Sequence, residues 1–283
     1  MPNLIKKYPV AAFYVVALLI GGIFTAPFIA NYLGLIPPVP FFIIFVAAFS
    51  ASLAGIIITG VISGWAGVKA LLGRFLIWRF GIGWWLAALL LPALATLGSV
   101  LLSSLFGGRP LDTSQLQPLY TLIPLLLMKV IQAGVGEEFG WRGFALPRLQ
   151  SRHNALVASI IVGVMHGLWH WPMYFIEPLT QYYEQVAWGF VPALLLDTVM
   201  VTLWSIMYTW LYNNTKGSVL IAAFFHGAVP TWTSYFATTG AWGGEIDMGP
   251  FVWYMGVFAV INIAIVAIYG PTHLSRKAER QTA

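Results

Sequence analysis

A polar run interrupts one of the long apolar stretches of this chain: Gly136-Glu137-Glu138-Phe139-Gly140-Trp141-Arg142. The surrounding sequence is apolar enough for a membrane-spanning helix, and each charge at the centre of such a helix costs about 2.5–3.5 kcal/mol on insertion scales. Charged groups persist there when they pair with one another or line a cavity, and they mark functional sites by default. The run therefore predicts a polar site inside a membrane helix.

The composition is that of a polytopic membrane protein. Of the 283 residues, 59% are hydrophobic and 8% are charged, whereas a soluble domain carries about 25% charged residues. The chain has no cysteine, which excludes disulfides, thiolate metal ligands and a cysteine nucleophile. Eight apolar segments approach the about 20 residues that a spanning helix needs. They cover 10–32, 39–63, 82–106, 118–146, 154–175, 188–212, 217–239 and 250–270.

The loop charges predict the orientation of these helices. Most lysines and arginines fall in loops on one side, and the opposite loops contain Arg109 and most of the acids. By the positive-inside rule, the basic side and both termini face the cytoplasm. The first segment exceeds the about 7–15 apolar residues of a signal-peptide core, so we expect it to be a retained helix. The prediction is an all-α polytopic transmembrane bundle of about eight helices, forming a single domain over 1–283.

The net charge of +5 is explained by this topology. No basic stripe or base-reading motif accompanies it, so we expect no nucleic-acid partner. The segment 64–80 mixes aromatic and basic residues and predicts an amphipathic stretch at the cytoplasmic surface.

Within the fourth segment, the spacing separates the two glutamates. Glu138 and Arg142 are four residues apart, so they share a helix face and can pair. Glu137 lies about 100° around the helix, so we expect it to face a cavity. Gly136 and Gly140 offer a small surface for close helix approach.

Two of the three histidines in later segments lie at the depth of Glu137, and the third, His170, lies deeper, so that a kinked or tilted helix is needed to bring it to the others. His166 and His170 share a face of the segment 154–175, and His226 lies in 217–239. At 1.5 Å per residue, Glu137, His166 and His226 lie about 15–18 Å from the cytoplasmic helix ends, and His170 about 24 Å. Pro172 predicts a break directly after His170. These groups can therefore meet near the middle of the membrane.

Other polar residues of the segments have simpler interpretations. A histidine in a membrane helix is more often an interhelical hydrogen-bonder than a catalyst, and this reading is favoured for His166. Asp197 has no evident partner in the sequence, and we expect a structural role. Lys129 lies about 28 Å from the cytoplasmic end, so its side chain is expected to reach outward.

The chain resembles the CAAX-protease and bacteriocin-processing family, which comprises multi-pass membrane glutamate proteases called type II CAAX prenyl endopeptidases. Its Glu-Glu-x-x-x-Arg motif is matched by Glu137, Glu138 and Arg142. The resemblance covers about 120–235, which we therefore interpret as the catalytic core.

Two further motifs are matched at their histidines only. His170 occupies the histidine of Phe-x-x-x-His, with His166 at the phenylalanine position. His226 occupies the histidine of His-x-x-x-Asn, with Pro230 at the asparagine position. Because Pro230 has no side-chain donor, it leaves catalytic competence open.

The resemblance implies an intramembrane endopeptidase whose substrate enters a membrane cavity. Glu137 would be the general base, His170 would hold the water and His226 would stabilise the oxyanion. Glu138 and Arg142 would fix the geometry of the site. The implied partners are the lipid bilayer and a peptide or membrane-protein substrate, including prenylated ones. The expected location is the bacterial plasma membrane, as an integral multi-pass protein.

Alternative interpretations remain open. The chain could instead be a non-catalytic membrane scaffold or a bacteriocin-immunity-type protein that keeps the polar cluster for packing. A proton- or ion-coupled transporter is a third possibility, although no internal repeat supports it. Thr231, Thr233 or His166 could replace the missing asparagine donor.

We expect the mechanism to need no cofactor. The alternative is a metalloprotease-like zinc site made by Glu137, His166, His170 and His226. The His-x-x-x-His pair has zincin spacing but lacks the glutamate that follows the first histidine in zincins.

Overall fold

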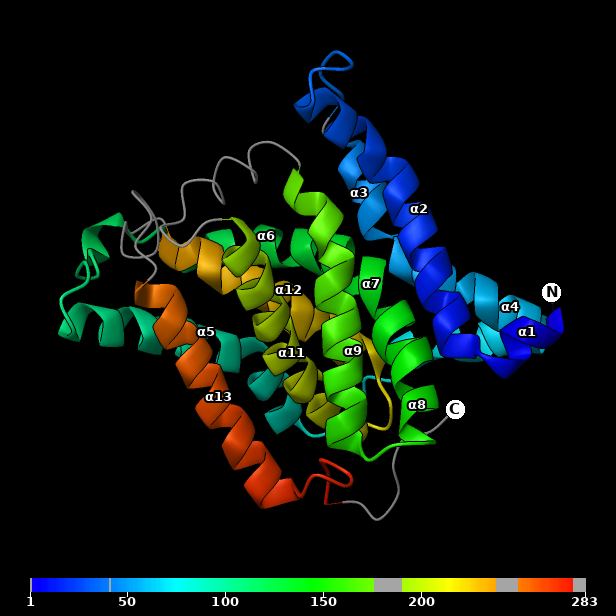
Figure 1. Cartoon of the computed structure of the whole chain (residues 1–283). Helices are drawn as coiled ribbons and strands as arrows, with labels where there is room; N and C mark the ends of the chain where they lie inside the picture. Colours follow the sequence, from blue (N-terminus) through cyan, green and yellow to red (C-terminus); the bar gives the residue numbers. More distant parts are fainter. Residues whose placement is uncertain (1, 41, 176–189, 238–248, 277–283) are drawn as a thin grey trace.

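The computed structural model describes residues 2–40, 42–175, 190–237 and 249–276. This described part is built of helices and contains no strand, which confirms the all-α class (Figure 1). The helices are α1 (Pro2–Lys7), α2 (Pro9–Tyr32), α3 (Ile43–Ala48), α4 (Ser50–Gly73), α5 (Ile82–Leu105), α6 (Leu122–Lys129), α7 (Gly136–Glu138), α8 (Leu146–Gln150), α9 (Ala155–His170), α11 (Phe190–Asn214), α12 (Val219–Ala237) and α13 (Gly249–Tyr269).

Seven helical stretches of the described residues are long and apolar enough to cross a membrane. The chain is therefore an integral multi-pass membrane protein. The predicted span 217–239 corresponds to α12, which is helical but does not belong to these seven. Its second half carries Pro230, Thr231 and Thr233, which lower its hydropathy. The seven stretches are Pro9–Tyr32, Ser50–Leu76, Ile82–Leu105, Leu119–Gln150, Ala155–Met173, Leu194–Asn214 and Pro250–Tyr269.

The predicted segment 39–63 is two helices rather than one. α3 and α4 are separated at Phe49, and α4 continues beyond Gly64 to Gly73. Gly64 has φ 62° and ψ −163°, a conformation that glycine adopts without a Cβ clash, and the helix kinks there. The stretch 64–80, predicted to be interfacial, is therefore helical over its first half. The predicted outward loop 176–187 lies outside the described residues.

The segment with the two glutamates is not a regular α-helix. Two π-helical stretches, Val130–Val135 and Phe139–Ala145, flank the short α7. π-Helical turns are rare and occur frequently at functional sites. Hydropathy predicted one continuous helix over 118–146. A hydropathy pattern contains no signal for the change from α-helix to π-helix.

The helices pack in two groups that meet around α7, α9 and α12 (Figure 1). One hydrophobic cluster joins α2, α4 and α9 to the segment 139–149, and the other joins α5, α11, α12 and α13. α9 packs closely against α11, because two glycines of α9 leave room for the backbone of α11. A Cβ at Gly163 would lie 2.5 Å from Thr202 Cα, and one at Gly167 would lie 2.7 Å from Thr198 Cα.

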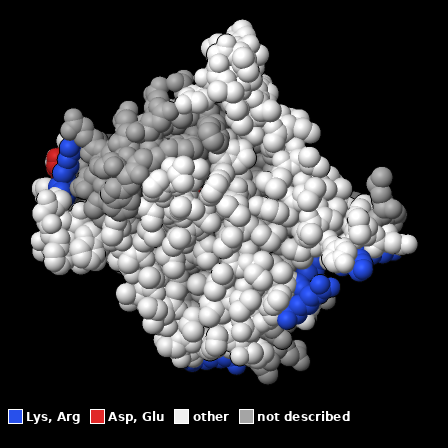
Figure 2. Space-filling view, viewed as in Figure 1, with Lys and Arg blue, Asp and Glu red and all other residues white. Residues whose placement is uncertain are grey.

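The surface charge agrees with the predicted topology. In Figure 2, lysines and arginines gather mainly along the lower and right-hand edges, and most of the described face between them is uncharged. The N-terminus and the end of α8 lie at these edges in Figure 1. The assignment of this side to the cytoplasm remains a prediction from the positive-inside rule.

Candidate active site

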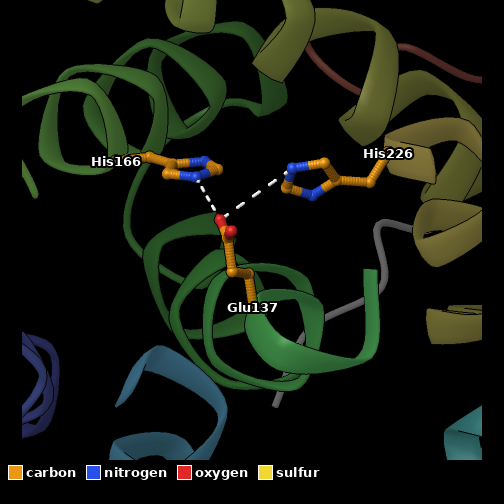
Figure 3. A group of neighbouring side chains, drawn as sticks. All are labelled: Glu137, His166 and His226. Carbon is orange, nitrogen blue, oxygen red and sulfur yellow. Dashed lines mark hydrogen bonds and ion pairs between the residues drawn. The ribbon is translucent and has the colours of Figure 1, made fainter. Parts of the chain in front are cut away.

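Glu137 is surrounded by the three histidines that the sequence singled out. Its Oε2 atom lies 2.6 Å from His166 Nε2, 3.9 Å from His226 Nε2 and 4.0 Å from His170 Nε2. Figure 3 shows the carboxylate of α7 pointing between His166 of α9 and His226 of α12. Glu137 is buried, with 4% of its surface exposed. The convergence expected from helix depth is therefore present in the structure.

The second glutamate connects the arginine to a histidine. Glu138 Oε1 accepts from Arg142 Nη1 at 3.1 Å, the pairing expected from their spacing. The same oxygen accepts from His226 Nδ1 at 2.7 Å. Because a carboxylate accepts hydrogen bonds, His226 carries its hydrogen on Nδ1, and its Nε2 faces Glu137.

Arg142 is fully buried, and it also determines which ring nitrogen of His166 carries the hydrogen. Its guanidinium carbon lies 3.8 Å from the ring centre of Tyr208, a cation–π geometry. Its Nη1 lies 3.4 Å from His166 Nδ1. Arginine only donates, so Nδ1 accepts, and His166 then donates its Nε2 hydrogen to Glu137. The His166 ring also stacks on Trp141, with centroids 4.8 Å apart.

Asp197 of α11 has a partner that the sequence did not indicate. Its Oδ2 lies 3.8 Å from His170 Nδ1, on the side of the ring opposite to Glu137. An acid inside an apolar segment was the available signal, but the sequence could not identify its neighbour. The predicted break after His170 is present, because the chain continues there as a 3-10 turn, Trp171–Phe175.

A cavity of about 370 Å³ opens beside the carboxylate. Pro230 lines this cavity together with Thr233, whereas Thr231 does not. The hydroxyl of Thr231 is buried and donates to the Gly227 carbonyl at 2.7 Å. The wall also contains aromatic side chains with a polar group, Trp204 and Tyr254, and the polar residues Lys129, Gln132, Glu137, His170, His226 and Thr233.

Lys129 also lies in the cavity wall. The sequence had suggested that its side chain reaches outward, to the membrane surface. The structure thus adds a cation to the surroundings of the glutamate.

Three of the four residues of the alternative zinc site lie close enough together to share a metal ion. Ligand atoms of Glu137, His166 and His226 all lie within 4.8 Å of one another, and His170 is not in this group. A metal at His166 Nε2 would require the hydrogen on Nδ1, where Arg142 Nη1 already points a donor. The donor set therefore fits zinc poorly at His166.

Comparisons with known proteins agree with the motifs. Residues 119–232 match the family model described as type II CAAX prenyl endopeptidase Rce1-like. Over 144 residues the chain is 34% identical to the protein named CAAX prenyl protease 2 of Methanococcus maripaludis. That alignment covers 49% of this chain and 51% of the relative, so the chain spans about half the length of the curated relative it matches. The matched segment contains both glutamates, the arginine and the three histidines, and over this segment the chain is similar to the Rce1-like type II CAAX prenyl endopeptidases.

Proposed function

We propose that this chain is an intramembrane endopeptidase in which Glu137 activates water for attack on a peptide bond. The observation that carries the proposal is the position of Glu137 Oε2, 4.0 Å from His170 Nε2 and beside the cavity. This separation is too long for a direct hydrogen bond and suits one bridging water. Glu137 would take a proton from that water as hydroxide adds to the carbonyl carbon.

His170 has a geometry that supports a role in holding this water. Its Nε2 faces Glu137 and its Nδ1 faces Asp197. If Nδ1 carries the hydrogen towards the aspartate, Nε2 accepts from the water and helps to align it. Asp197 would then act as a positioning residue, through the histidine.

His226 is placed to stabilise the charge that develops on the carbonyl oxygen. Because its Nδ1 donates to Glu138, its Nε2 can donate to an oxyanion only in the imidazolium form. The Glu138 carboxylate stabilises that form, and Arg142 holds Glu138 in place. Collapse of the intermediate breaks the C–N bond, and Glu137 returns its proton to the leaving amine.

The proposed mechanism uses no metal. Its support is the hydrogen-bond pattern of His166, in which Arg142 opposes the tautomer that a metal at Nε2 requires. Zinc held by Glu137 and His226 remains the competing arrangement.

The proposed substrates are peptides or tails of membrane proteins, including prenylated ones, that enter the cavity from the bilayer. The name of the relative, CAAX prenyl protease 2, favours a prenylated substrate. We place the protein in the plasma membrane of a bacterium.

The test uses purified full-length protein in lipid nanodiscs, incubated with a peptide library in ¹⁸O-labelled water. We expect one ¹⁸O atom in each new C-terminal carboxylate, and no such products with Glu137→Gln. Hydrolysis that survives prolonged chelation supports the metal-free mechanism. Stoichiometric zinc, lost together with activity on chelation, would refute it.

Pro230 favours a second candidate function, a non-catalytic scaffold or immunity protein. The proline lines the cavity one helical turn after His226, where the resemblance expects an asparagine donor. In that case the buried pairs of Glu137 and Glu138 would serve helix packing alone. Absence of labelled products from the wild-type protein would support this alternative.

A further inference from the structure

A basic cavity of about 260 Å³ lies where the start of α2 meets the end of α8 and the turn that follows it. Its wall contains Arg148, Arg152 and His153 from the second of these segments and Tyr8 from the first. Among the described residues, none lines both this cavity and the one beside Glu137. Figure 2 shows lysines and arginines along the lower right-hand edge, where Figure 1 places α8 and the N-terminus.

The two arginines of this wall have no carboxylate partner among the residues that the structure describes. Arg148 Nη1 donates to the Phe144 carbonyl at 3.0 Å, and its guanidinium carbon lies 3.7 Å from the centre of the Phe144 ring. The ion pairs of the described ranges involve neither Arg148 nor Arg152. The sequence has no Asp or Glu in 1–111 or in 139–176, the segments that form the wall. These segments therefore do not compensate the positive charge of the cavity.

The chemistry of the wall suits a phosphate group. Guanidinium groups bind phosphate oxygens through paired N–H donors, and they stay charged at any physiological pH. A further cation lies beside the same wall, because Lys7 Nζ is 5.1 Å from the centre of the Tyr8 ring. Arg148 is half-buried, so its attraction for an anion is screened less than that of a fully exposed arginine.

An apolar groove of about 410 Å³ adjoins the basic cavity, and the two share Tyr8 and Ala11 in their walls. The groove follows α2, the first helix that is apolar enough to span a membrane. It reaches Val16, seven residues beyond Pro9, and so extends about 10 Å along the helix from its first turn. The remaining residues of the groove are Leu4, Ile5, Ala12, Val15 and Ile58.

Together, the basic cavity and the apolar groove fit an amphipathic ligand with an anionic head. The basic cavity lies at the end of α2 that the positive-inside rule assigns to the cytoplasmic surface, and the groove leads from it towards the hydrocarbon core. Basic pockets between helices on the cytoplasmic side are suited to anionic lipid head groups. A soluble phosphate would use only the basic cavity, and a zwitterionic lipid would bring its own cation close to the arginines.

We propose that these two adjoining cavities bind one anionic glycerophospholipid of the cytoplasmic leaflet. Its phosphodiester lies between Arg148 and Arg152, and one acyl chain lies in the groove along α2. The lipid holds α2 against the glutamate-bearing segment, to which Phe13 already binds by packing edge-on against Trp141, with ring centroids 5.1 Å apart. This site goes beyond the proposed function, and its test does not depend on hydrolysis.

The test measures lipid binding to the purified full-length protein by native mass spectrometry from detergent micelles. The competing probes are dioleoyl phosphatidylglycerol, which is anionic, and dioleoyl phosphatidylcholine, which is zwitterionic, in equal amounts. Glycerol 3-phosphate in excess is the soluble probe. We expect the first phosphatidylglycerol to bind at least about tenfold more tightly than phosphatidylcholine. We also expect it to stay bound in the presence of glycerol 3-phosphate.

Charge variants separate this site from general attraction to basic residues. Arg148→Gln combined with Arg152→Gln should abolish the preference for phosphatidylglycerol. Arg152→Gln alone changes only an exposed side chain and should reduce the preference even if the double variant folds poorly. The matched control is Lys69→Gln combined with Arg79→Gln, which removes the same charge at exposed positions outside the cavity and should keep the preference.

Val15→Trp tests the groove separately. Val15 lines the groove but not the basic cavity, and 55% of its surface is exposed, so a tryptophan fills the groove without entering the core. Occupancy by phosphatidylglycerol should fall by about tenfold. Unchanged occupancy would overturn the placement of the acyl chain.

Three results would overturn the proposal as a whole. The first is equal binding of the two lipids to the wild-type protein. The second is a preference that persists in both arginine variants, or one that the control variant loses to the same extent. The third is displacement of the lipid by glycerol 3-phosphate, which would identify the basic cavity as a site for free phosphate.

Discussion

His166 Nε2 lies 2.6 Å from Glu137 Oε2, so this chain holds its proposed base with a histidine where the family motif has phenylalanine. The same ring accepts from Arg142 and stacks on Trp141. His166 therefore connects the two charged residues of the segment, from a position that leaves Glu137 open to the cavity. This arrangement indicates a restraining role for His166 rather than a part in bond cleavage.

Replacing His166 by phenylalanine tests this role. His166→Phe removes the donor to Glu137 and one of the two acceptors of Arg142 Nη1, which keeps Glu138, so the free energy of unfolding should fall by about 1–3 kcal/mol. Hydrolysis by the folded protein should remain within about tenfold of wild type. His170→Ala, the comparison variant, should lose about 10²–10⁴ in kcat/KM. Equal losses in the two variants would place His166 in the catalytic machinery.

Asp197→Asn tests the proposed orientation of His170. The variant keeps the shape of the side chain but loses the charge that lies 3.8 Å from His170 Nδ1. We expect kcat to fall by about tenfold with little change in KM, because the histidine is less well aligned. The same substitution in a His170→Ala background should have no further effect, as a double-mutant cycle would show. Asp112→Asn, in an exposed loop, is the control. Additive losses would contradict the orientation role.

Pro230→Asn tests the missing oxyanion donor. An asparagine side chain would lie in the cavity wall one turn after His226, and one such donor is worth about 10²–10³ in kcat. We expect a gain in kcat of up to this size, measured with the peptides that the library assay identifies. Pro230→Ala relieves the helix without adding a donor and should give no comparable gain. Similar rates in both variants would show that the donor does not limit catalysis.

Gly140→Ala tests the close packing that supports the site. A Cβ at Gly140 would collide with the Ala51 carbonyl oxygen of α4, and backbone cannot move aside cheaply. Overpacking of this kind costs about 1–3 kcal/mol. Gly22→Ala, in α2, meets nothing within 4 Å and should be neutral or slightly stabilising. Thermal unfolding in nanodiscs compares the two, and equal melting temperatures would contradict the predicted clash.

The sequence predicted the fold class and most of the helices because apolar length and loop charge are local signals. It also predicted the pairing of Glu138 with Arg142, because a spacing of four residues defines a helix face. The depth of each residue along its helix predicted that Glu137, His166 and His226 lie at the same level of the membrane. This prediction used no information on how the helices pack. These inferences needed only the chain and the thickness of a membrane.

The remaining features depend on winding and on contacts between distant helices. Two π-helical stretches change the faces of the segment 130–145, and hydropathy is insensitive to one extra residue per turn. Asp197 could be recognised as unusual, but its contact with His170 follows from the packing of α9 on α11. Lys129 was expected to reach outward, and only the position of α6 beside the cavity changes that interpretation.

The central claim is that Glu137 makes this protein a peptidase. The most direct measurement compares the terminal peptides of membranes from cells that express wild type or Glu137→Gln at matched levels. Glutamine keeps the shape of the side chain but cannot take a proton from water. The account predicts new peptide termini with wild type that are absent with Glu137→Gln. Identical termini, with both proteins folded and equally abundant, would contradict it.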